Sequence, residues 1–286
     1  MTVKVQVGPP QISIHQGQTV LISEEDGRIN WPSEKGLYFL DTRVVSSWAI
    51  YANGEPWELL NGGAISYYAS RIFLTNRSLL TEDGTIPPRT LGLTVSRSIR
   101  GGMHEDLDVT NNGMKPMRFQ LEIALRCDFA DVFEVKSGRI VRRGRITTQW
   151  SEPHQHLRTT YCNGDFSRAV TISPAHSPAK AVYANGRLSF EVALEPGEAW
   201  HCCLLYTLAD GDRHFAPPSD CVIVPVAPSG TSTRSPLGII TASALRLNVI
   251  CSRMFIPSFS AFTPWRPSRR RPPARCAACA MPASRT

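Results

Sequence analysis

The sequence predicts an all-β protein, an antiparallel β-sandwich or super-sandwich with a disordered C-terminal tail. Short segments in which apolar and polar residues alternate recur at intervals of about 8–12 residues, with turn residues between them. Asn-Gly pairs, which accept the positive φ of tight turns at low cost, stand at 53–54, 163–164 and 185–186. No long amphipathic helical pattern occurs before Asp210. These three observations favour antiparallel sheets over a helical or α/β architecture.

The clearest strands are predicted in the central stretch, residues 90–135. Apolar residues alternate with polar ones over 91–99, 105–110 and 119–125, which is typical of strands with one buried face. Asn111-Asn112-Gly113 would form the hairpin turn before the last of them. We therefore expect an antiparallel meander with one solvent-facing side. The second strand would direct its polar residues outward, namely Asp106, Asp108 and Thr110.

The remaining strands are predicted on both sides of this stretch. Before it, short strands are expected within residues 1–30, then at 37–40, as one continuous strand over 44–51, and at 57–60 and 64–74. After it, strands are expected at 146–150, 157–162, 166–172, 188–194 and 200–208.

The composition divides the chain into a β-sandwich at residues 1–215 and a linker with a tail at 216–286. Pro, Ser, Ala and Arg dominate the second part, and residues 266–286 hold six arginines and no acidic residue. Such a segment cannot bury enough apolar surface to order itself. The abrupt loss of the strand pattern leads to the hypothesis that the tail is translated out of frame. Sequencing the locus for a single-base shift would test that hypothesis.

Charge and targeting signals exclude several classes of function. The net charge is +7, but the tail arginines supply most of the excess, so we expect no nucleic-acid partner. No apolar run is long enough for a transmembrane helix, and the N-terminus lacks a signal-peptide pattern. We therefore expect a cytoplasmic protein with no membrane partner. The eight cysteines show no framework spacing and are expected to be free thiols.

Two acidic groups are candidates for chemistry. Asp128, Asp131 and Glu134 could supply the two carboxyl groups that glycoside hydrolysis requires. The favoured interpretation is structural, with these acids paired across the sheet to one of three arginines: Arg43, Arg100 or Arg126. The triplet His104-Glu105-Asp106 could hold a metal or relay a proton, but adjacent strand residues point to opposite faces. A structural role is expected here as well.

Histidine and cysteine pairs complete the search for reactive groups. His154-x-His156 would place two imidazoles on one face of a strand, but no third ligand has a telling spacing. Cys202-Cys203 lies in an apolar strand without a neighbouring base, and Cys276-x-x-Cys279 lacks a second pair. We therefore expect no catalytic residue, no metal site and no cofactor.

Aromatic residues gather in the N-terminal quarter and could bind sugar rings. The apolar C–H face of a sugar stacks on an exposed aromatic ring. The candidates for such a platform are Trp31, Trp48 and Trp57. Aromatic residues in strands also commonly belong to the core, so both interpretations stay open.

Three blocks of sequence resemble the N-terminal domain of glycogen debranching enzymes of the amylo-α-1,6-glucosidase type. They are GLYFLDTRVVSSWAIYANGEPWELL at 36–60, SRSIRGGMHEDLDVTNN at 96–112 and DFADVFEVK at 128–136, in the family's order and at about its spacing. The resemblance covers roughly residues 10–210. Its motif positions in this sequence are Asp41, Arg43, His104, Glu105, Asp106, Asp128, Asp131 and Glu134.

The resemblance implies a β-sandwich that precedes a helical toroid, which carries the acid and base that hydrolyse α-1,6-glucosidic branch points. Nothing similar to that toroid follows in this sequence, so we expect a non-catalytic domain truncated before the catalytic one. The implied partners are an α-glucan and the toroid. Two alternatives stay open, namely a free-standing carbohydrate-binding β-sandwich and a structural module that docks on a separate catalytic chain.

Overall fold

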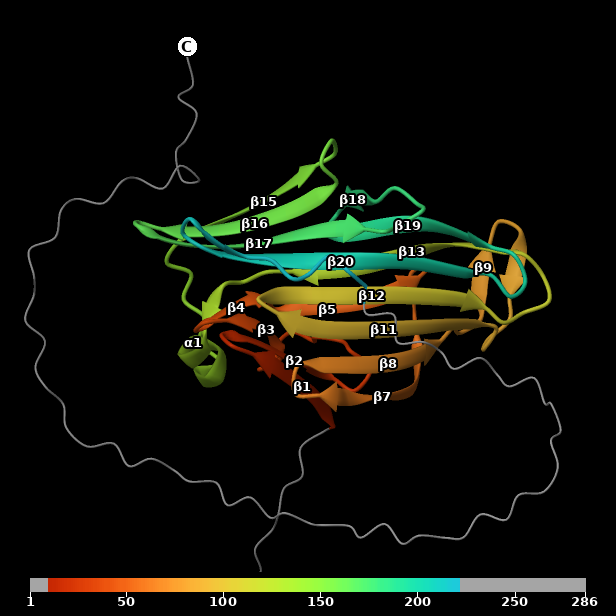
Figure 1. Ribbon diagram of the computed structural model, residues 1–286, viewed down its shortest axis with the longest axis horizontal. Helices are drawn as coiled ribbons and strands as arrows, with labels where there is room; N and C mark the ends of the chain where they lie inside the picture. Colours follow the sequence, from red (N-terminus) through yellow and green to blue (C-terminus); the bar gives the residue numbers. More distant parts are fainter. Residues whose placement is uncertain (1–9, 222–286) are drawn as a thin grey trace, which may run out of the picture. The chain divides into compact units, whose positions relative to one another are not determined.

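The computed structural model describes residues 10–221, which form an all-β fold (Figure 1). In this range every regular element except the short helix α1 (Val132–Ser137) is a strand, so the predicted fold class is confirmed. The strands predicted within residues 1–9, the part of the predicted tail after residue 221 and the Cys276-x-x-Cys279 pair lie outside the described residues.

The largest layer is a nine-stranded antiparallel sheet, the large sheet. Its strands follow the order β15-β16-β17-β20-β12-β11-β8-β7, and β21 also pairs with β20. Figure 1 shows these strands stacked one above the other across the molecule. Their bounds are β7 Glu58–Ser66, β8 Ala69–Thr75, β11 Leu91–Arg100, β12 Gly102–Asn111, β15 Arg145–Ser151, β16 His156–Asn163, β17 Phe166–Ala175, β20 Ala199–Asp210 and β21 Arg213–Phe215.

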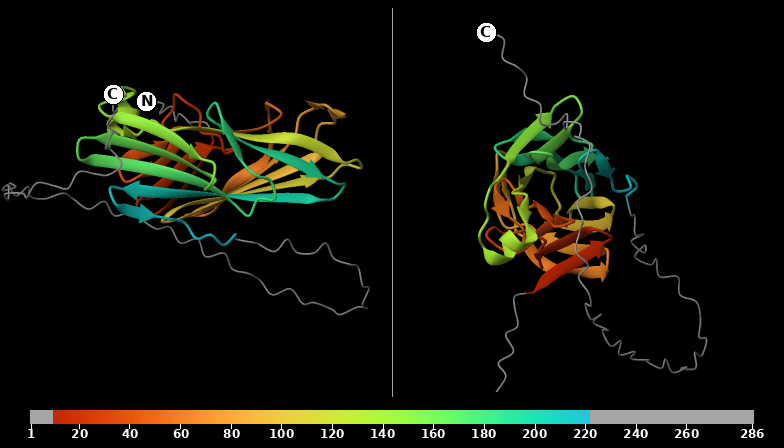
Figure 2. Two further views of the ribbon diagram at one scale, coloured as in Figure 1. Left: turned by 90° about the horizontal axis from the view of Figure 1, so that it is seen from above. Right: turned by 90° about the vertical axis from the view of Figure 1, so that its left-hand side faces the viewer.

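Two five-stranded antiparallel sheets pack on the inner face of the large sheet (Figure 2). One has the order β18-β19-β13-β5-β6, with β5 Ser47–Ala52, β6 Glu55–Pro56, β13 Met117–Arg126, β18 Val182–Ala184 and β19 Arg187–Leu194. The other has the order β1-β2-β3-β4-β14, with β1 Gln11–Gln16, β2 Thr19–Glu24, β3 Gly36–Phe39, β4 Thr42–Val45 and β14 Ala130–Asp131. A separate hairpin pairs β9 (Leu79–Thr81) with β10 (Gly84–Ile86).

A single hydrophobic cluster joins the three sheets. Leu107 of β12, Leu121 of β13 and Leu37 of β3 all belong to it and are fully buried. The predicted alternation is the reason, since β11 buries every second residue and so does β13. Because a strand points successive side chains to opposite faces, each sheet supplies one apolar face to this core.

The predicted central meander is wrong at its third strand. β11 and β12 pair as expected, but β12 pairs next with β20, and β13 pairs with β5 and β19 in the opposite sheet. Asn111 therefore ends a strand at a corner between two layers, where its side-chain amide donates to the carbonyls of Lys115 and Leu194. Alternation identified the buried face of each strand, but it carries no information about which sheet the strand joins.

Two further segments differ from their predictions. The continuous strand expected over 44–51 is broken at Ser46, because β4 and β5 belong to different sheets. The acidic segment 128–135 was not expected to be helical, yet α1 begins within it. No helix in the described part of the chain is long and apolar enough to cross a membrane.

The hairpin turns are where the Asn-Gly pairs predict them. Asn53 and Gly54 have φ values of 47° and 79° between β5 and β6, and Asn185 and Gly186 have values of 51° and 78° between β18 and β19. Asparagine and glycine tolerate this left-handed region better than other residues.

Candidate functional site

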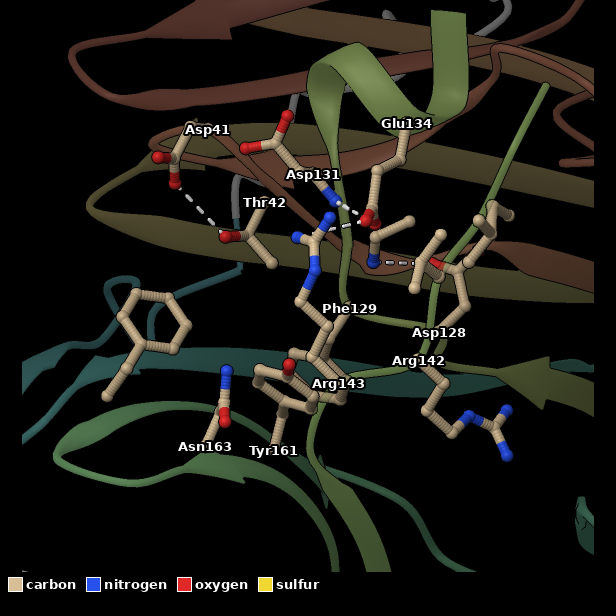
Figure 3. A pocket seen from close by; sticks show the side chains of 14 residues that line it. Asp41, Thr42, Asp128, Phe129, Asp131, Glu134, Arg142, Arg143, Tyr161 and Asn163 are labelled. Carbon is tan, nitrogen blue, oxygen red and sulfur yellow. Dashed lines mark hydrogen bonds and ion pairs between the residues drawn. The ribbon is translucent and has the colours of Figure 1, made fainter. Parts of the chain in front are cut away.

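A pocket of about 200 Å³ lies beside α1, at one end of the sandwich (Figure 3). It brings together four of the motif positions, namely Asp41, Asp128, Asp131 and Glu134. The loop 140–143 and the side chains of Tyr161, Asn163 and Phe166 complete its wall. Residues of two of the three family blocks, 36–60 and 128–136, therefore meet here, which makes the pocket the natural candidate site.

The carboxylate of Asp128 is held by a buried arginine. Arg43 Nε and Nη2 lie 3.2 and 2.5 Å from the two carboxylate oxygens of Asp128. Only 1% of the Arg43 side chain is exposed, and its Nη1 also donates to the carbonyls of Ser33 and Lys35. A bidentate pair of this kind fixes both side chains. Of the three arginines considered from the sequence, Arg43 is the partner, and Arg100 and Arg126 are exposed.

Asp131 and Glu134 cap the helix α1. The Asp131 carboxylate accepts a hydrogen bond from the Phe133 amide at 2.8 Å, and Glu134 Oε2 accepts one from the Asp131 amide at 3.4 Å. This reciprocal arrangement is a capping box, which satisfies two amides that the first helical turn leaves without partners. The other oxygen of Glu134 lies 3.2 Å from Arg143.

The pocket therefore holds carboxylates that serve the fold. Asp128 is paired with Arg43, and Asp131 and Glu134 hold α1 in place. Asp41 is the solvated acid at the rim, with 60% of its side chain exposed and one oxygen 3.9 Å from Arg168 Nη2. Hydrolysis of a glycoside needs an acid and a base, or an acid and a nucleophile, facing the bond, and the internal partners of these groups favour the structural interpretation.

The triplet His104-Glu105-Asp106 on β12 is divided between two environments. Glu105 points into the core, where Arg97 Nε lies 2.7 Å from Oε1 and the Tyr206 hydroxyl donates to Oε2 at 2.8 Å. Both partners of this ion pair are essentially fully buried. His104 and Asp106 lie on the outer face, as the alternation of a strand requires.

The outer face at His104 and Asp106 is covered, so the expectation that Asp106 points to solvent is wrong. The segment 216–221 returns over it after β21, and the Pro218 carbonyl lies 2.8 Å from His104 Nδ1. Asp106 is only 6% exposed, and its Oδ1 contacts His104 Nε2 at 2.9 Å and Cys203 Sγ at 3.2 Å.

These contacts shift the protonation equilibria of the outer face. The hydrogen bond to Asp106 raises the pKa of His104, although burial opposes it. Burial favours the neutral form of Asp106, but the hydrogen bonds from His104 and Cys203 outweigh it and lower the pKa of Asp106. Burial, together with the neighbouring Cys221 and Asp106, raises the pKa of Cys203.

The three tryptophans predicted as a sugar platform have separate locations. Trp48 is 1% exposed, with the Arg97 guanidinium 4.2 Å from its ring centroid, and Trp57 is 7% exposed against Phe119. Neither can present a ring face to a sugar, because both are core residues. Trp31 is 58% exposed, and it alone of the three remains a candidate for stacking.

Within residues 10–221, the His154-x-His156 pair gathers no further ligands, whereas Cys203 of the cysteine pair does. The rings of His154 and His156 stack with their centroids 5.9 Å apart. Cys127, Cys202, Cys203 and Cys221 are free thiols, but Cys162 is disulfide-bonded, so the expectation that every cysteine is a free thiol is wrong at Cys162. Both Cys202 and Cys203 are fully buried, Cys202 in the hydrophobic core and Cys203 against Asp106 on the outer side of the sheet. Sequence reasoning missed this convergence of His104, Asp106 and Cys203, because the residues are distant in the chain.

Solved structures show only a weak likeness to this chain. A candidate kojibiose phosphorylase from the human microbiome is 10% identical over 69% of this chain and 30% of that one, with a TM-score of 0.48. A candidate aldose 1-epimerase from Escherichia coli K12 is 12% identical over 71% of this chain and 100% of that one, with a TM-score of 0.42. A galactose mutarotase-like protein from Lactobacillus casei ATCC 334 is 11% identical, covers 70% and 100%, and has a TM-score of 0.40. No curated protein matches the chain.

The fold and the pocket define a β-sandwich module whose clustered carboxylates hold its own structure together. The family follows from the sequence, because residues 14–205 match the N-terminal domain of (some) glycogen debranching enzymes. The chain belongs to this family. The match spans nearly all of the described sandwich, and the resemblance found in the three sequence blocks is confirmed.

Proposed function

We propose that this chain acts as the non-catalytic N-terminal β-sandwich of a glycogen debranching enzyme, beside a helical toroid domain that hydrolyses α-1,6-glucosidic branch points. The family match over residues 14–205 carries this proposal. The structural use of the pocket carboxylates supports the non-catalytic part, since Asp128, Asp131 and Glu134 all have partners within the sandwich.

The first test is hydrolysis by the full chain alone. Glucose release from a branched α-glucan should equal the background measured with a linear α-glucan. The control is the Glu134→Gln variant, which keeps the shape of the side chain but removes its charge. Glucose release that is specific for the branched substrate and lost in Glu134→Gln would overturn the non-catalytic assignment.

The apolar residues around the pocket supply a surface for the catalytic domain. Phe133 is 77% exposed on α1, and Ile140, Val141 and Phe166 on the pocket wall are 41%, 55% and 40% exposed. Exposed apolar side chains gathered in one place mark sites of interaction. In this proposal the surface around α1 meets the toroid and holds it in position for a branched substrate.

A matched pair of variants tests this docking surface. The full chain is mixed with a separately purified toroid domain of a glycogen debranching enzyme, and the complex is followed by analytical ultracentrifugation. Phe133→Ser should weaken the complex. Leu80→Ser changes an equally apolar residue, 80% exposed on β9, at the far end of the sandwich from α1 (Figure 1), and should leave the complex intact. Equal affinities for the two variants would contradict the location of the surface.

A second candidate function is binding of an α-glucan by the sandwich itself. Trp31, which is 58% exposed, favours it. Retention of the full chain on an α-glucan affinity gel should fall in Trp31→Ala and persist in Tyr67→Ala, where the lost aromatic is 62% exposed. Retention that is unchanged in Trp31→Ala would remove the last of the three predicted tryptophans from this role.

A further inference from the structure

Metal-binding side chains from three parts of the chain converge on the outer face of the large sheet. β12 supplies Asp106, β20 supplies His201 and Cys203, and the segment after β21 supplies Cys221. The strand register explains the first three, because Asp106 is paired directly with Cys203 and Asp108 directly with His201. His201 and Cys203 share a face because they are two residues apart in a strand. Cys221, in the segment that covers this face, contacts both His201 and Cys203.

We propose that Asp106, His201, Cys203 and Cys221 bind one Zn²⁺ ion. His201 Nε2 lies 3.1 Å from Cys203 Sγ, 3.2 Å from Cys221 Sγ and 3.9 Å from Asp106 Oδ1. Cys203 Sγ lies 3.0 Å from Cys221 Sγ and 3.2 Å from Asp106 Oδ1. In a tetrahedral zinc site the ligand atoms are about 3.3–3.8 Å apart, given bonds of about 2.0 Å to N or O and 2.3 Å to S. To reach zinc geometry, the separation of the two sulfur atoms would lengthen by about 0.8 Å and that of His201 Nε2 from Asp106 Oδ1 would shorten by about 0.5 Å.

Two further side chains, Asp108 and His104, hydrogen-bond to the proposed ligands and orient them, as is common in zinc sites. Asp108 Oδ1 lies 2.7 Å from His201 Nδ1. A carboxylate in this place accepts a hydrogen bond from Nδ1–H, which keeps the proton on Nδ1 and leaves the Nε2 lone pair free to face the metal. His104 orients the second ligand, because its Nε2 lies 2.9 Å from Asp106 Oδ1 and its Nδ1 faces the Pro218 carbonyl.

The donor set selects zinc and a structural role. Two thiolates, one imidazole and one carboxylate form a borderline-soft set that suits Zn²⁺ in a tetrahedron. Four protein ligands leave no open position for a substrate, as in structural zinc sites. The ion would join β12, β20 and the segment 216–221, and so hold that segment on the large sheet.

The test measures zinc in the full chain, purified without oxygen, freed of metal with a chelator and then reloaded. We expect one tightly bound zinc ion, counted by elemental mass spectrometry, with its affinity measured against a chromophoric chelator. Asp108→Asn should weaken zinc binding by about 10–100-fold, as expected when the carboxylate behind a ligating histidine is lost. Cys221→Ser should exceed that loss, because it removes a ligand. Co²⁺ in place of zinc should show the visible bands of a tetrahedral site and a thiolate charge-transfer band.

Two control variants separate this site from other ligands in the chain. The double variants Cys276→Ser/Cys279→Ser and His154→Ala/His156→Ala should keep the zinc ion and its affinity. Zinc that survives Cys221→Ser but is lost in either control would overturn the proposal. A chain that binds no zinc, or one in which peptide mapping finds a Cys203–Cys221 disulfide under these conditions, would overturn it as well. Circular dichroism of each variant checks that the fold is intact.

Discussion

The buried ion pair between Arg97 and Glu105 should be a main determinant of stability. The guanidinium contacts Glu105, donates to the Gly27 carbonyl at 2.8 Å and lies over the Trp48 ring. Burial raises the pKa of Tyr206, so its hydroxyl stays protonated and donates to Glu105. Replacing Glu105 with alanine leaves the positive charge of Arg97 without a counter-charge at a side chain that is 1% exposed.

The expected cost of Glu105→Ala is about 3–5 kcal/mol, the usual penalty for breaking a buried pair by removing one partner. For a domain of this size, that loss corresponds to a fall in Tm of about 6–20 °C. Tyr206→Phe removes only one hydrogen bond to the carboxylate and should cost about 1.5–3 kcal/mol. The double variant Arg97→Met/Glu105→Leu should lose less stability than the single variants Arg97→Met and Glu105→Leu lose together. Neither partner is then left charged and alone.

Urea denaturation of the full chain, followed by tryptophan fluorescence, measures these losses, since Trp48 lies against the pair. The expected losses in unfolding free energy depend on coupling between the charges of Arg97 and Glu105. A Glu105→Ala variant that loses less than about 1 kcal/mol, below the range for buried pairs, would refute it. Strictly additive losses in the double variant would refute it too.

Three further predictions concern the helix cap, a buried thiol and the close packing at β12. Asp131→Ala should destabilise the sandwich by about 0.5–2 kcal/mol in urea denaturation, because the Phe133 amide loses its cap, and a loss within error would contradict the capping role. Burial raises the pKa of Cys202 to about 12, so at pH 8, roughly four units lower, peptide mapping should find it unlabelled by a thiol reagent until urea unfolds the chain. Gly102→Ala would place a Cβ 2.1 Å from the Tyr206 carbonyl oxygen, whereas Gly63→Ala meets nothing within 4 Å. Thermal unfolding should therefore show a loss for the first and little change for the second, and equal Tm values would contradict the close packing at β12.

The sequence predicted the local features of the fold well and its long-range pairing poorly. Asn53-Gly54 and Asn185-Gly186 form the expected hairpins, because the requirement for positive φ is a property of the turn itself. Whether β13 pairs with β12 or crosses to the opposite sheet depends on packing between distant segments, and the same alternation serves both arrangements. The helix α1 was missed because its short sequence also alternates like a strand.

For the candidate site too, the sequence predicted local features but not contacts between distant residues. The pairing of Asp128 with a distant arginine was expected, but three arginines were equally plausible from the sequence, and only the fold selects Arg43. The convergence of Asp106 with Cys203 depends on a strand register that joins residues 97 positions apart. The spacings His104-x-Asp106 and His201-x-Cys203 were the local signals, since each places two ligand types on the same side of a strand.

β12 carries ionisable side chains on both of its faces, with Glu105 inside and His104 and Asp106 outside. An ordinary amphipathic strand resists a shift of one residue only because its apolar side chains would leave the core. In β12 the same shift would drive a histidine and an aspartate into the apolar interior and expel the partner of Arg97. The register of β12 is therefore fixed by charge as well as by apolar burial. Because β11 and β20 both pair with β12, their registers are fixed with it.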